Sequence, residues 1–225
     1  MSAIVSMKMY NYSGKSLYDH FYNIEVDMIH IVRHGKTDLN GLHVLQGRSD
    51  HPLNEEGICQ SEQLAVLLGG ITFDHVFSSP LKRAIQTAEI IAPYKTALID
   101  ERLIEMDYGP YEGADPKDPP VEIVQFFSDF VHNPAPEGME QLNDVVKRAA
   151  SFIEGIRSLR GNILISAHAI SMKGILEYLT PDSRGSYWSK YIGNCTVYVA
   201  DNHEGKISVL CELKKENAND RQNKE

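Results

Sequence analysis

Two short apolar runs, residues 28–32 (MIHIV) and residues 162–166 (NILIS), constrain the fold of this chain most strongly. Both are too short for an ordinary helix and stop abruptly at polar residues, which is typical of buried strands. Arg33 and His34 follow the first run directly, and His168 lies just past the end of the second. The pattern therefore predicts two buried strands, each with a histidine just beyond its carboxyl end.

Strand-like and helix-like segments alternate along the rest of the chain. Further strands are expected over residues 74–78, 96–99, 196–199 and 207–210. Helices are expected over residues 54–68 with Asn54 as N-cap, and over residues 81–92, 121–131, 140–159 and 169–179. Residues 36–53 and 109–120 are expected to be loops. The alternation predicts a three-layer α/β/α sandwich around a mostly parallel central sheet.

Length and composition favour one catalytic domain over residues 28–213 of the 225-residue chain. Residues 1–27 form an extension of unknown role, and the charged residues 214–225 are expected to be a disordered tail. The net charge of −9 argues against nucleic-acid binding. Three cysteines without CxxC spacing argue against a disulfide framework and a zinc site. No apolar run approaches the roughly 18 residues of a membrane span, so a cytoplasmic protein is expected.

Arg33, His34, Arg83 and His168 form the candidate site. Ligands of parallel sheets bind beyond the carboxyl ends of the strands, which is where both histidines fall. Arginine offers a planar fork of donors to phosphoryl oxygens. A neutral imidazole is a good nucleophile near neutral pH. Gly35 is expected to give the backbone room beside the reacting group. These residues together point to phosphoryl chemistry.

Residues 31–40 (IVRHGKTDLN) resemble the signature of the histidine phosphatase superfamily, also called the phosphoglycerate mutase-like family. Further blocks resemble that family in the same order: residues 46–53, 78–88, 103–113, 136–148, 164–168 and 193–195. The resemblance covers roughly residues 28–212. A lone Arg-His-Gly tripeptide would be a weak signal, but an ordered set of blocks is a specific one.

The resemblance implies a role for each matched residue. His34 would be the nucleophile that becomes phosphohistidine, Glu105 the general acid and base, and His168 a further catalytic residue. The remaining candidates would bind the phosphate or the substrate: Arg33, Thr37, Asn40, Gln46, the Gly47 backbone, Arg83 and Ala169. No metal and no cofactor is implied. The expected substrate is a small phosphorylated metabolite, and the protein is expected to be a monomer or homodimer.

The chain departs from the family pattern at three positions. Ala169 stands where glycine usually follows the last histidine, and its methyl group is expected to affect the phosphate pocket. Lys36 often corresponds to an acidic residue, and Met139 replaces a frequent glycine. Asp107 and Glu112 lie close to Glu105 in sequence, but the spacing from Tyr108-Gly109 favours Glu105 as the acid.

Hydrolysis of a phosphate ester is favoured over two alternatives, a phosphoglycerate mutase and a non-catalytic binding protein on the same fold. Residues 113–136 contain a single cation, Lys117, where a mutase would need several for the substrate carboxylate.

Two sets of aromatic residues and two further histidines have no role in this candidate site. Among Phe126, Phe127 and Phe130, a lid is possible, but burial is expected for at least two. Core or interface positions are expected for Tyr187, Trp188 and Tyr191. Among the other histidines, His43 and His51 have a modest chance of touching substrate.

Overall fold

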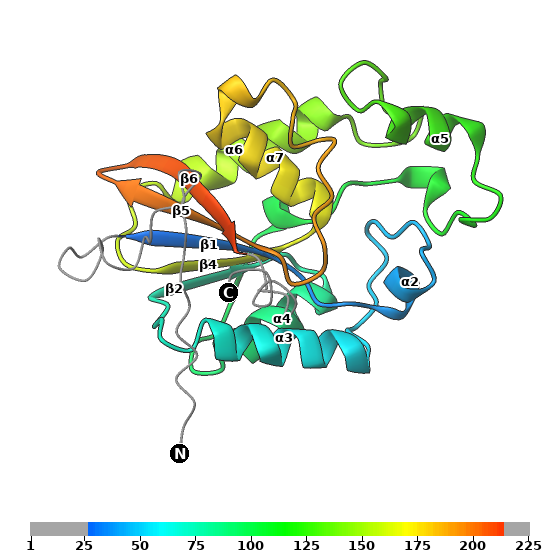
Figure 1. The fold of residues 1–225 in the computed structure, drawn as a ribbon. Helices are drawn as coiled ribbons and strands as arrows, with labels where there is room; N and C mark the ends of the chain where they lie inside the picture. The colour runs from blue at the N-terminus through cyan, green and yellow to red at the C-terminus, as the bar shows by residue number, and fades with distance from the viewer. Residues whose placement is uncertain (1–26, 214–225) are drawn as a thin grey trace, which may run out of the picture.

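The computed structural model describes residues 27–213, and the segments 1–26 and 214–225 for which an extension and a tail were expected lie outside them. One six-stranded sheet in the order β3-β2-β4-β1-β5-β6 forms the centre of the molecule (Figure 1). Its strands are β1 (Met28–Arg33), β2 (His75–Ser78), β3 (Leu98–Ile99), β4 (Ile163–Ala167), β5 (Val197–His203) and β6 (Lys206–Leu213). The pairs β1–β4, β4–β2 and β2–β3 are parallel, whereas β5 is antiparallel to β1 and to β6. The predicted mostly parallel sheet is confirmed.

Helices cover both faces of this sheet (Figure 1). The helices α3 (Glu55–Leu67) and α4 (Lys82–Ile91) lie on one face, and α6 (Leu142–Ile156) and α7 (Ala169–Leu179) lie on the other. The short helices α2 (Asp38–Gly41) and α5 (Val121–Ser128) lie beyond one end of the sheet. Three 3₁₀ turns connect elements at Glu101–Leu103, Gly109–Tyr111 and Pro181–Ser183. The three-layer sandwich is therefore also as predicted.

Several element boundaries differ from those expected, and local hydrogen bonds explain one of them. Helix α5 ends at Ser128 instead of residue 131 because the Asp129 carboxylate accepts hydrogen bonds from the backbone N–H groups of Val131 and His132 (3.0 and 3.2 Å). Helix α6 begins two residues later than expected, and β5 and β6 are longer than expected. The expected N-cap of α3 is confirmed, since the Asn54 side chain accepts from the Gly57 N–H at 2.9 Å.

Helix α2 lies inside the segment that was expected to be a loop, residues 36–53. A capping box forms it: Thr37 Oγ1 accepts from the Asn40 N–H, and Asn40 Oδ1 accepts from the Thr37 N–H, both at 3.2 Å. The signal was present in the sequence as a Thr followed three residues later by an amide side chain.

Alternate residues of β1 face two separate cores, as the two-residue period of a strand requires. Ile29 and Ile31 pack in the cluster under α6 and α7. Val32 packs in the cluster over α3 and α4. The five residues of β4 are all buried, which matches a central strand covered on both faces.

A third apolar cluster anchors the inserted helix α5 beside the end of the sheet. Phe126 from α5 packs there with Met139 and Trp188, and Phe130 lies at its margin. The expected burial of at least two phenylalanines is wrong, because Phe126 alone of the three is buried, Phe130 is partly buried and Phe127 is exposed. Trp188 is a core residue as expected. Met139 gains apolar contacts that the frequent glycine could not make.

Gly35 serves a different purpose from the one expected. A Cβ at this position would lie 2.4 Å from the carbonyl oxygen of Gly57, in the first turn of α3. A Cβ on Gly57 would in turn lie 2.0 Å from the carbonyl oxygen of Lys36. The two glycines therefore allow α3 to approach the backbone that follows β1.

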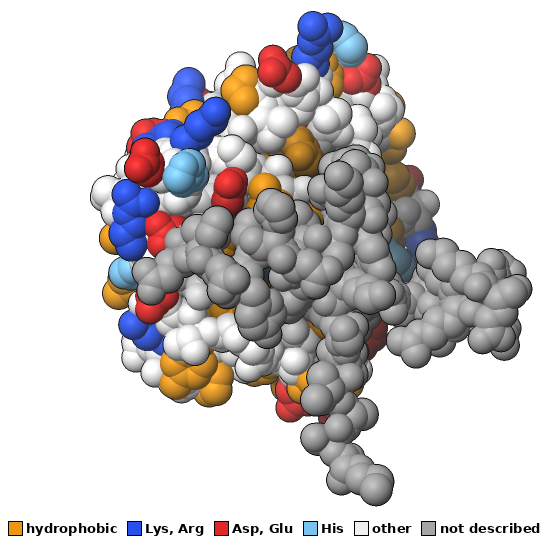
Figure 2. All heavy atoms as spheres, turned by 60° about the vertical axis from the view of Figure 1, so that its left-hand side comes forward, with side chains coloured by type: hydrophobic (Ala, Val, Ile, Leu, Met, Phe, Trp, Pro, Cys, Tyr) orange, Lys and Arg blue, Asp and Glu red, His pale blue; other side chains and the backbone are white. Residues whose placement is uncertain are grey.

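Charged side chains are mixed on the surface. Lys and Arg side chains are interspersed with Asp and Glu side chains on the described part of the face in Figure 2, unlike a basic nucleic-acid surface. Within residues 27–213, no helix has the length and apolar character needed to cross a membrane.

Acid is expected to destabilise the protein through His30, which is buried beside Phe73 (ring centroids 5.4 Å). Burial lowers the pKa of His30 from 6.5 to about 4. In the unfolded chain this histidine is protonated below about pH 6.5, whereas in the folded chain it is protonated only below about pH 4. The free energy of unfolding therefore falls as the pH is lowered through this window. Two and a half pH units correspond to roughly 3 kcal/mol.

His30→Leu is expected to lose less unfolding free energy than the wild type between pH 7 and pH 4.5, measured by urea denaturation. His203→Leu, which removes an exposed histidine of β5, is the control. Equal losses in the wild type and His30→Leu would contradict the assignment.

Candidate active site

His34 and His168 meet at one edge of the sheet because their strands are parallel neighbours. Arg33 at the end of β1 pairs with Ala167 at the end of β4, and the His34 N–H donates to the Ala167 carbonyl at 3.0 Å. The two imidazole ring centroids lie 5.0 Å apart. Both side chains are buried. The structure thus brings together the two histidines that the sequence placed at strand ends.

The His34 ring has a defined tautomer. Its Nδ1 lies 2.6 Å from the Gly35 carbonyl oxygen, which can only accept, so Nδ1 carries the proton and Nε2 has the free lone pair. Burial, together with the positive charges of Arg83 and Arg33, holds the pKa of His34 well below its ordinary value. The imidazole is therefore neutral at physiological pH, with Nε2 available as a nucleophile.

His168 directs its Nδ1 atom toward the same guanidinium N–H that contacts His34 Nε2. Arg83 Nε donates to His168 Nδ1 and also to His34 Nε2, at 3.2 Å in each case. His168 Nε2 lies 2.7 Å from Ser79 Oγ, a partner that the sequence did not reveal. Burial and the charge of Arg83 hold the pKa of His168 well below its ordinary value. Two neutral imidazoles therefore flank one guanidinium N–H.

Arg83 is fully buried at the start of α4, and its terminal nitrogens are held by backbone. Nη1 donates to the Ser49 carbonyl at 2.7 Å and Nη2 to the Gly47 carbonyl at 2.6 Å. Burial lowers the pKa of Arg83 to about 10, so the group remains charged at neutral pH. These contacts fix the guanidinium in one orientation.

Glu112 positions the 47–49 loop, whose carbonyl groups accept hydrogen bonds from Arg83. Its Oε1 accepts from the N–H groups of Gly47 (3.1 Å) and Ser49 (2.6 Å), and its Oε2 accepts from the Arg48 N–H at 3.1 Å. The Gly47 N–H, expected to help bind phosphate, is thus directed to Glu112, and Gly47 contributes through its carbonyl. Glu112 was considered in the sequence only as an alternative to Glu105.

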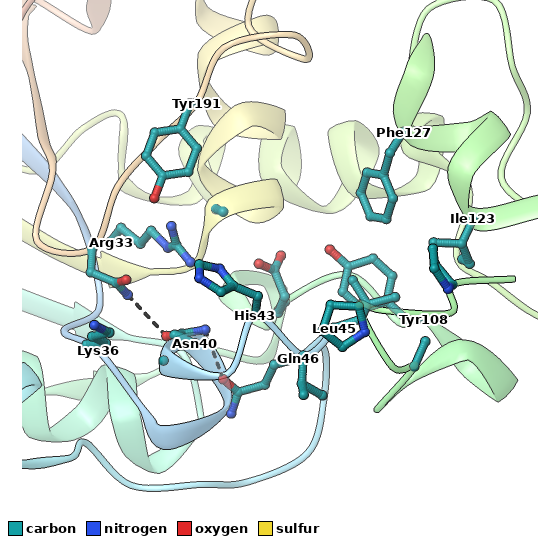
Figure 3. Close-up of a pocket in the computed structure, with 18 of the residues that line it drawn as sticks. Arg33, Lys36, Asn40, His43, Leu45, Gln46, Tyr108, Ile123, Phe127 and Tyr191 are labelled. Atoms are coloured by element: carbon teal, nitrogen blue, oxygen red, sulfur yellow. Dashed lines mark hydrogen bonds between the residues drawn. The ribbon is translucent and has the colours of Figure 1, made fainter.

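Arg33 lines the pocket, and its side chain points into it (Figure 3). One terminal nitrogen, Nη1, donates to the Ile192 carbonyl, while Nε is buried and has no hydrogen-bond partner among the described residues. Burial lowers the pKa of Arg33, and the nearby Glu105 carboxylate opposes that shift. An unpartnered, buried guanidinium N–H fits an anionic ligand.

Glu105 sits at the amino end of α7. Its carboxylate accepts from the N–H groups of Ser171 (3.1 Å) and Ile170 (3.2 Å), and from Met106 (2.8 Å). Arg148 donates to the Ile104 carbonyl at 2.6 Å and so holds the backbone that carries Glu105. Glu105 is buried and lines the pocket.

A network of amide side chains continues from the His34 backbone. Asn194 Nδ2 donates to the His34 carbonyl (3.0 Å) and to Asn40 Oδ1 (3.2 Å). Gln46 Oε1 accepts from Thr37 Oγ1 (2.7 Å) and from Asn40 Nδ2 (3.3 Å). Gln46 Nε2 is buried without a partner among the described residues. The predicted residues Thr37, Asn40 and Gln46 thus form one unit, which Asn194 joins to His34.

The pocket above these groups has two lobes. The first encloses about 550 Å³ beside the 36–46 and 114–119 segments, and the second about 480 Å³ beside α7 and the 188–192 segment. Ala169, the first residue of α7, lines both lobes together with Arg33, Leu45, Tyr108, Phe127 and Tyr191. The methyl group of Ala169 therefore forms part of the wall next to His168.

Several other expectations are settled by the pocket lining. Lys36 lines the first lobe and forms an ion pair with Glu56 at 2.7 Å. His43 points into this lobe from the loop after α2 (Figure 3), whereas His51 is exposed and does not line it. A core position for Tyr191 is wrong, because its side chain is exposed and lines the pocket, and an interface role stays a prediction. In residues 27–213, no group of three or more His, Cys, Asp or Glu side chains is arranged to bind a metal ion.

Comparisons with known proteins agree with this geometry. The model of the histidine phosphatase superfamily (branch 1) matches residues 29–212. The chain is 28% identical over 195 residues to "Phosphoserine phosphatase 1" from Hydrogenobacter thermophilus, covering 81% of this chain and 92% of that protein. It is 30% identical over 186 residues to a 2,3-bisphosphoglycerate-dependent phosphoglycerate mutase from Thermoplasma acidophilum, covering 80% and 90%.

The fold also resembles solved structures. A phosphoserine phosphatase variant from Entamoeba histolytica, crystallised with phosphoserine, superposes with a TM-score of 0.73 at 24% identity, over 83% of this chain and 96% of that one. This likeness concerns the arrangement of helices and strands.

Glu112→Gln is expected to weaken binding of inorganic phosphate about tenfold or more. The variant places an NH₂ group where a carboxylate oxygen accepts from the backbone N–H groups of residues 47–49, so the loop loses hydrogen bonds and no longer fixes Arg83. Isothermal titration calorimetry measures the change. Glu62→Gln, on the exposed face of α3, is the matched control and should bind phosphate like the wild type. Unchanged affinity in Glu112→Gln would show that Arg83 keeps its position without the clamp.

Proposed function

This chain belongs to the histidine phosphatase superfamily, and on that premise we propose that it hydrolyses phosphate monoesters of small metabolites through a phosphohistidine at His34. The hydrogen bond from His34 Nδ1 to the Gly35 carbonyl, 2.6 Å long, carries the proposal. It fixes the neutral tautomer whose Nε2 accepts from the Arg83 Nε–H, beside the positive charges of Arg83 and Arg33. A structural histidine has no need of that arrangement.

In the first step His34 Nε2 attacks the phosphorus atom, so an N–P bond forms while the P–O bond to the alcohol breaks. The Nε–H groups of Arg33 and Arg83 bind the non-bridging oxygens, which carry the charge of the transition state. His168 lies within reach of the same oxygens, on the other side of the Arg83 N–H. A phosphate bound at these positions accepts from the Arg83 Nε–H, which in the structure donates to the two imidazoles.

The departing alkoxide takes a proton from Glu105. In the second step a water molecule gives a proton to the Glu105 carboxylate and attacks phosphorus. The N–P bond breaks, its electron pair returns to His34 Nε2, and inorganic phosphate leaves.

A phosphatase and a phosphoglycerate mutase differ in what accepts the phosphoryl group from the histidine in the second step: water in the first case, a phosphoglycerate in the second. Relatives of similar identity carry both names, so identity alone does not decide between them. The single cation in residues 113–136 favours hydrolysis, because a mutase must bind the substrate carboxylate firmly through both steps.

His34→Ala is expected to abolish turnover by at least about 10⁴-fold, as loss of a covalent nucleophile does. The wild type, mixed with a substrate ester and quenched in neutral denaturant, should show a phosphate adduct on the peptide containing His34 by mass spectrometry. His132→Ala, which removes an exposed histidine outside the pocket, is the control. Turnover in His34→Ala at the wild-type rate would refute the mechanism, and isomerised phosphoglycerate without phosphate release would establish the mutase instead.

Glu105→Gln is expected to lower kcat about 100-fold or more for alkyl phosphates, because an alkoxide leaving group needs a proton. The loss should be much smaller for 4-nitrophenyl phosphate, whose leaving group is stable as an anion. Asp107→Asn is the matched control, since Asp107 pairs with Arg48 at 3.1 Å. If Glu105→Gln slows both esters equally, the carboxyl group is not the proton donor.

A further inference from the structure

The pocket is lined by Arg33, the neighbour of His34 in the sequence, and its walls include several aromatic side chains. Phe127 on α5 and Tyr191 in the segment before β5 lie on opposite sides of the opening (Figure 3). Both line both lobes. Their exposed fractions, 37% for Phe127 and 83% for Tyr191, are high for large aromatic side chains. Aromatic faces left open to solvent around a cavity mark a site for an apolar or flat ligand.

The wall on the Phe127 side is continuous. The ring centroids of Tyr108 and Phe127 lie 6.3 Å apart, and those of Phe127 and Phe130 lie 5.2 Å apart. Helix α5 is anchored by the buried Phe126 below this wall. Phe127 is therefore presented to the pocket from a fixed support.

The lysines of the two lobes already have partners. Lys36 pairs with Glu56 at 2.7 Å, and Lys190 pairs with Glu212 at 2.8 Å. The buried Lys173 donates to the Trp188 carbonyl at 2.6 Å, and its ammonium lies 5.0 Å from the Phe130 ring centroid. A second anionic group on the substrate would have to compete with these contacts, whereas an uncharged ring would not.

Each lobe is large for an acyclic alcohol of a few carbon atoms, since volumes of about 550 and 480 Å³ fall in the range of pockets that enclose whole organic ligands. We propose that the alcohol part of the substrate carries a flat, uncharged ring that lies between Tyr191 and Phe127 while the phosphate lies on His34. This inference rests on the proposed function and specifies its substrate class.

Binding of two phosphonates tests the ring site without turnover. Ethylphosphonate and 2-phenylethylphosphonate differ only by the phenyl group, and calorimetry with the wild type should show about tenfold or greater preference for the phenyl compound, the size of one ring stacked on an aromatic side chain. Phe127→Ala should reduce this preference and leave ethylphosphonate binding unchanged, and Tyr191→Ala should also reduce the preference. Val124→Ala, exposed on the same helix and outside the pocket lining, should keep it. Because the Tyr191 side chain is largely exposed, its variant is expected to fold normally.

Turnover of ethyl phosphate, 2-phenylethyl phosphate and phosphoserine separates the two proposals. A higher kcat/KM for 2-phenylethyl phosphate that falls in both variants supports the ring site. Equal values for the two alkyl esters, a preference unaffected by both variants, or phosphoserine as the best substrate overturns it while hydrolysis at His34 stands. If no ester is hydrolysed but the phosphonate preference is present, the ring site is retained and the proposed reaction fails.

Discussion

Burial of the Arg83 guanidinium is the constraint on which the rest of the site depends. A charged group without water must find a partner for every N–H, or its burial is strongly unfavourable. Two loop carbonyls accept from its terminal nitrogens, and the two imidazoles accept from Nε. An imidazole can accept only through a free lone pair, so this contact requires both histidines to be neutral at those nitrogens. The arginine therefore orders the 47–49 loop and selects the histidine tautomers through one set of hydrogen bonds, and so prepares His34 for the proposed nucleophilic role.

The parts of this arrangement that arise from local signals were predictable from the sequence. Short apolar runs define β1 and β4, and their parallel pairing places His34 and His168 on the same edge. The Asn54 cap and the helix that carries Arg83 follow from residue types within one helical turn. Such signals act over a few residues, so they can be read without knowing what the chain packs against.

The contacts that orient these residues could not be predicted, because they join segments far apart in sequence. Glu112 reaches Gly47 across 65 residues, and Ser79 reaches His168 across 89. Spacing along one chain says which elements form, but not which loop carbonyls will face a guanidinium. The core position considered for Tyr191 is wrong for a related reason: aromatic residues usually lie in the core, whereas this one is exposed in a segment without regular structure that lines the pocket.

The phosphate side and the aromatic side of the pocket differ in how many hydrogen bonds fix their side chains. This difference bears on how one fold serves several substrates. On the phosphate side, nearly every polar group is fixed by a buried hydrogen bond, so a change at one residue disturbs the others. On the other side, Phe127 comes from the inserted helix α5 and Tyr191 from an irregular segment, and both side chains are exposed. Relatives named phosphatase and mutase, at 28% and 30% identity to this chain, are compatible with such a division. If the hydrogen-bonded side binds the phosphoryl group as proposed, specificity for the alcohol is to be sought in the aromatic wall, because the phosphoryl group is common to all such substrates.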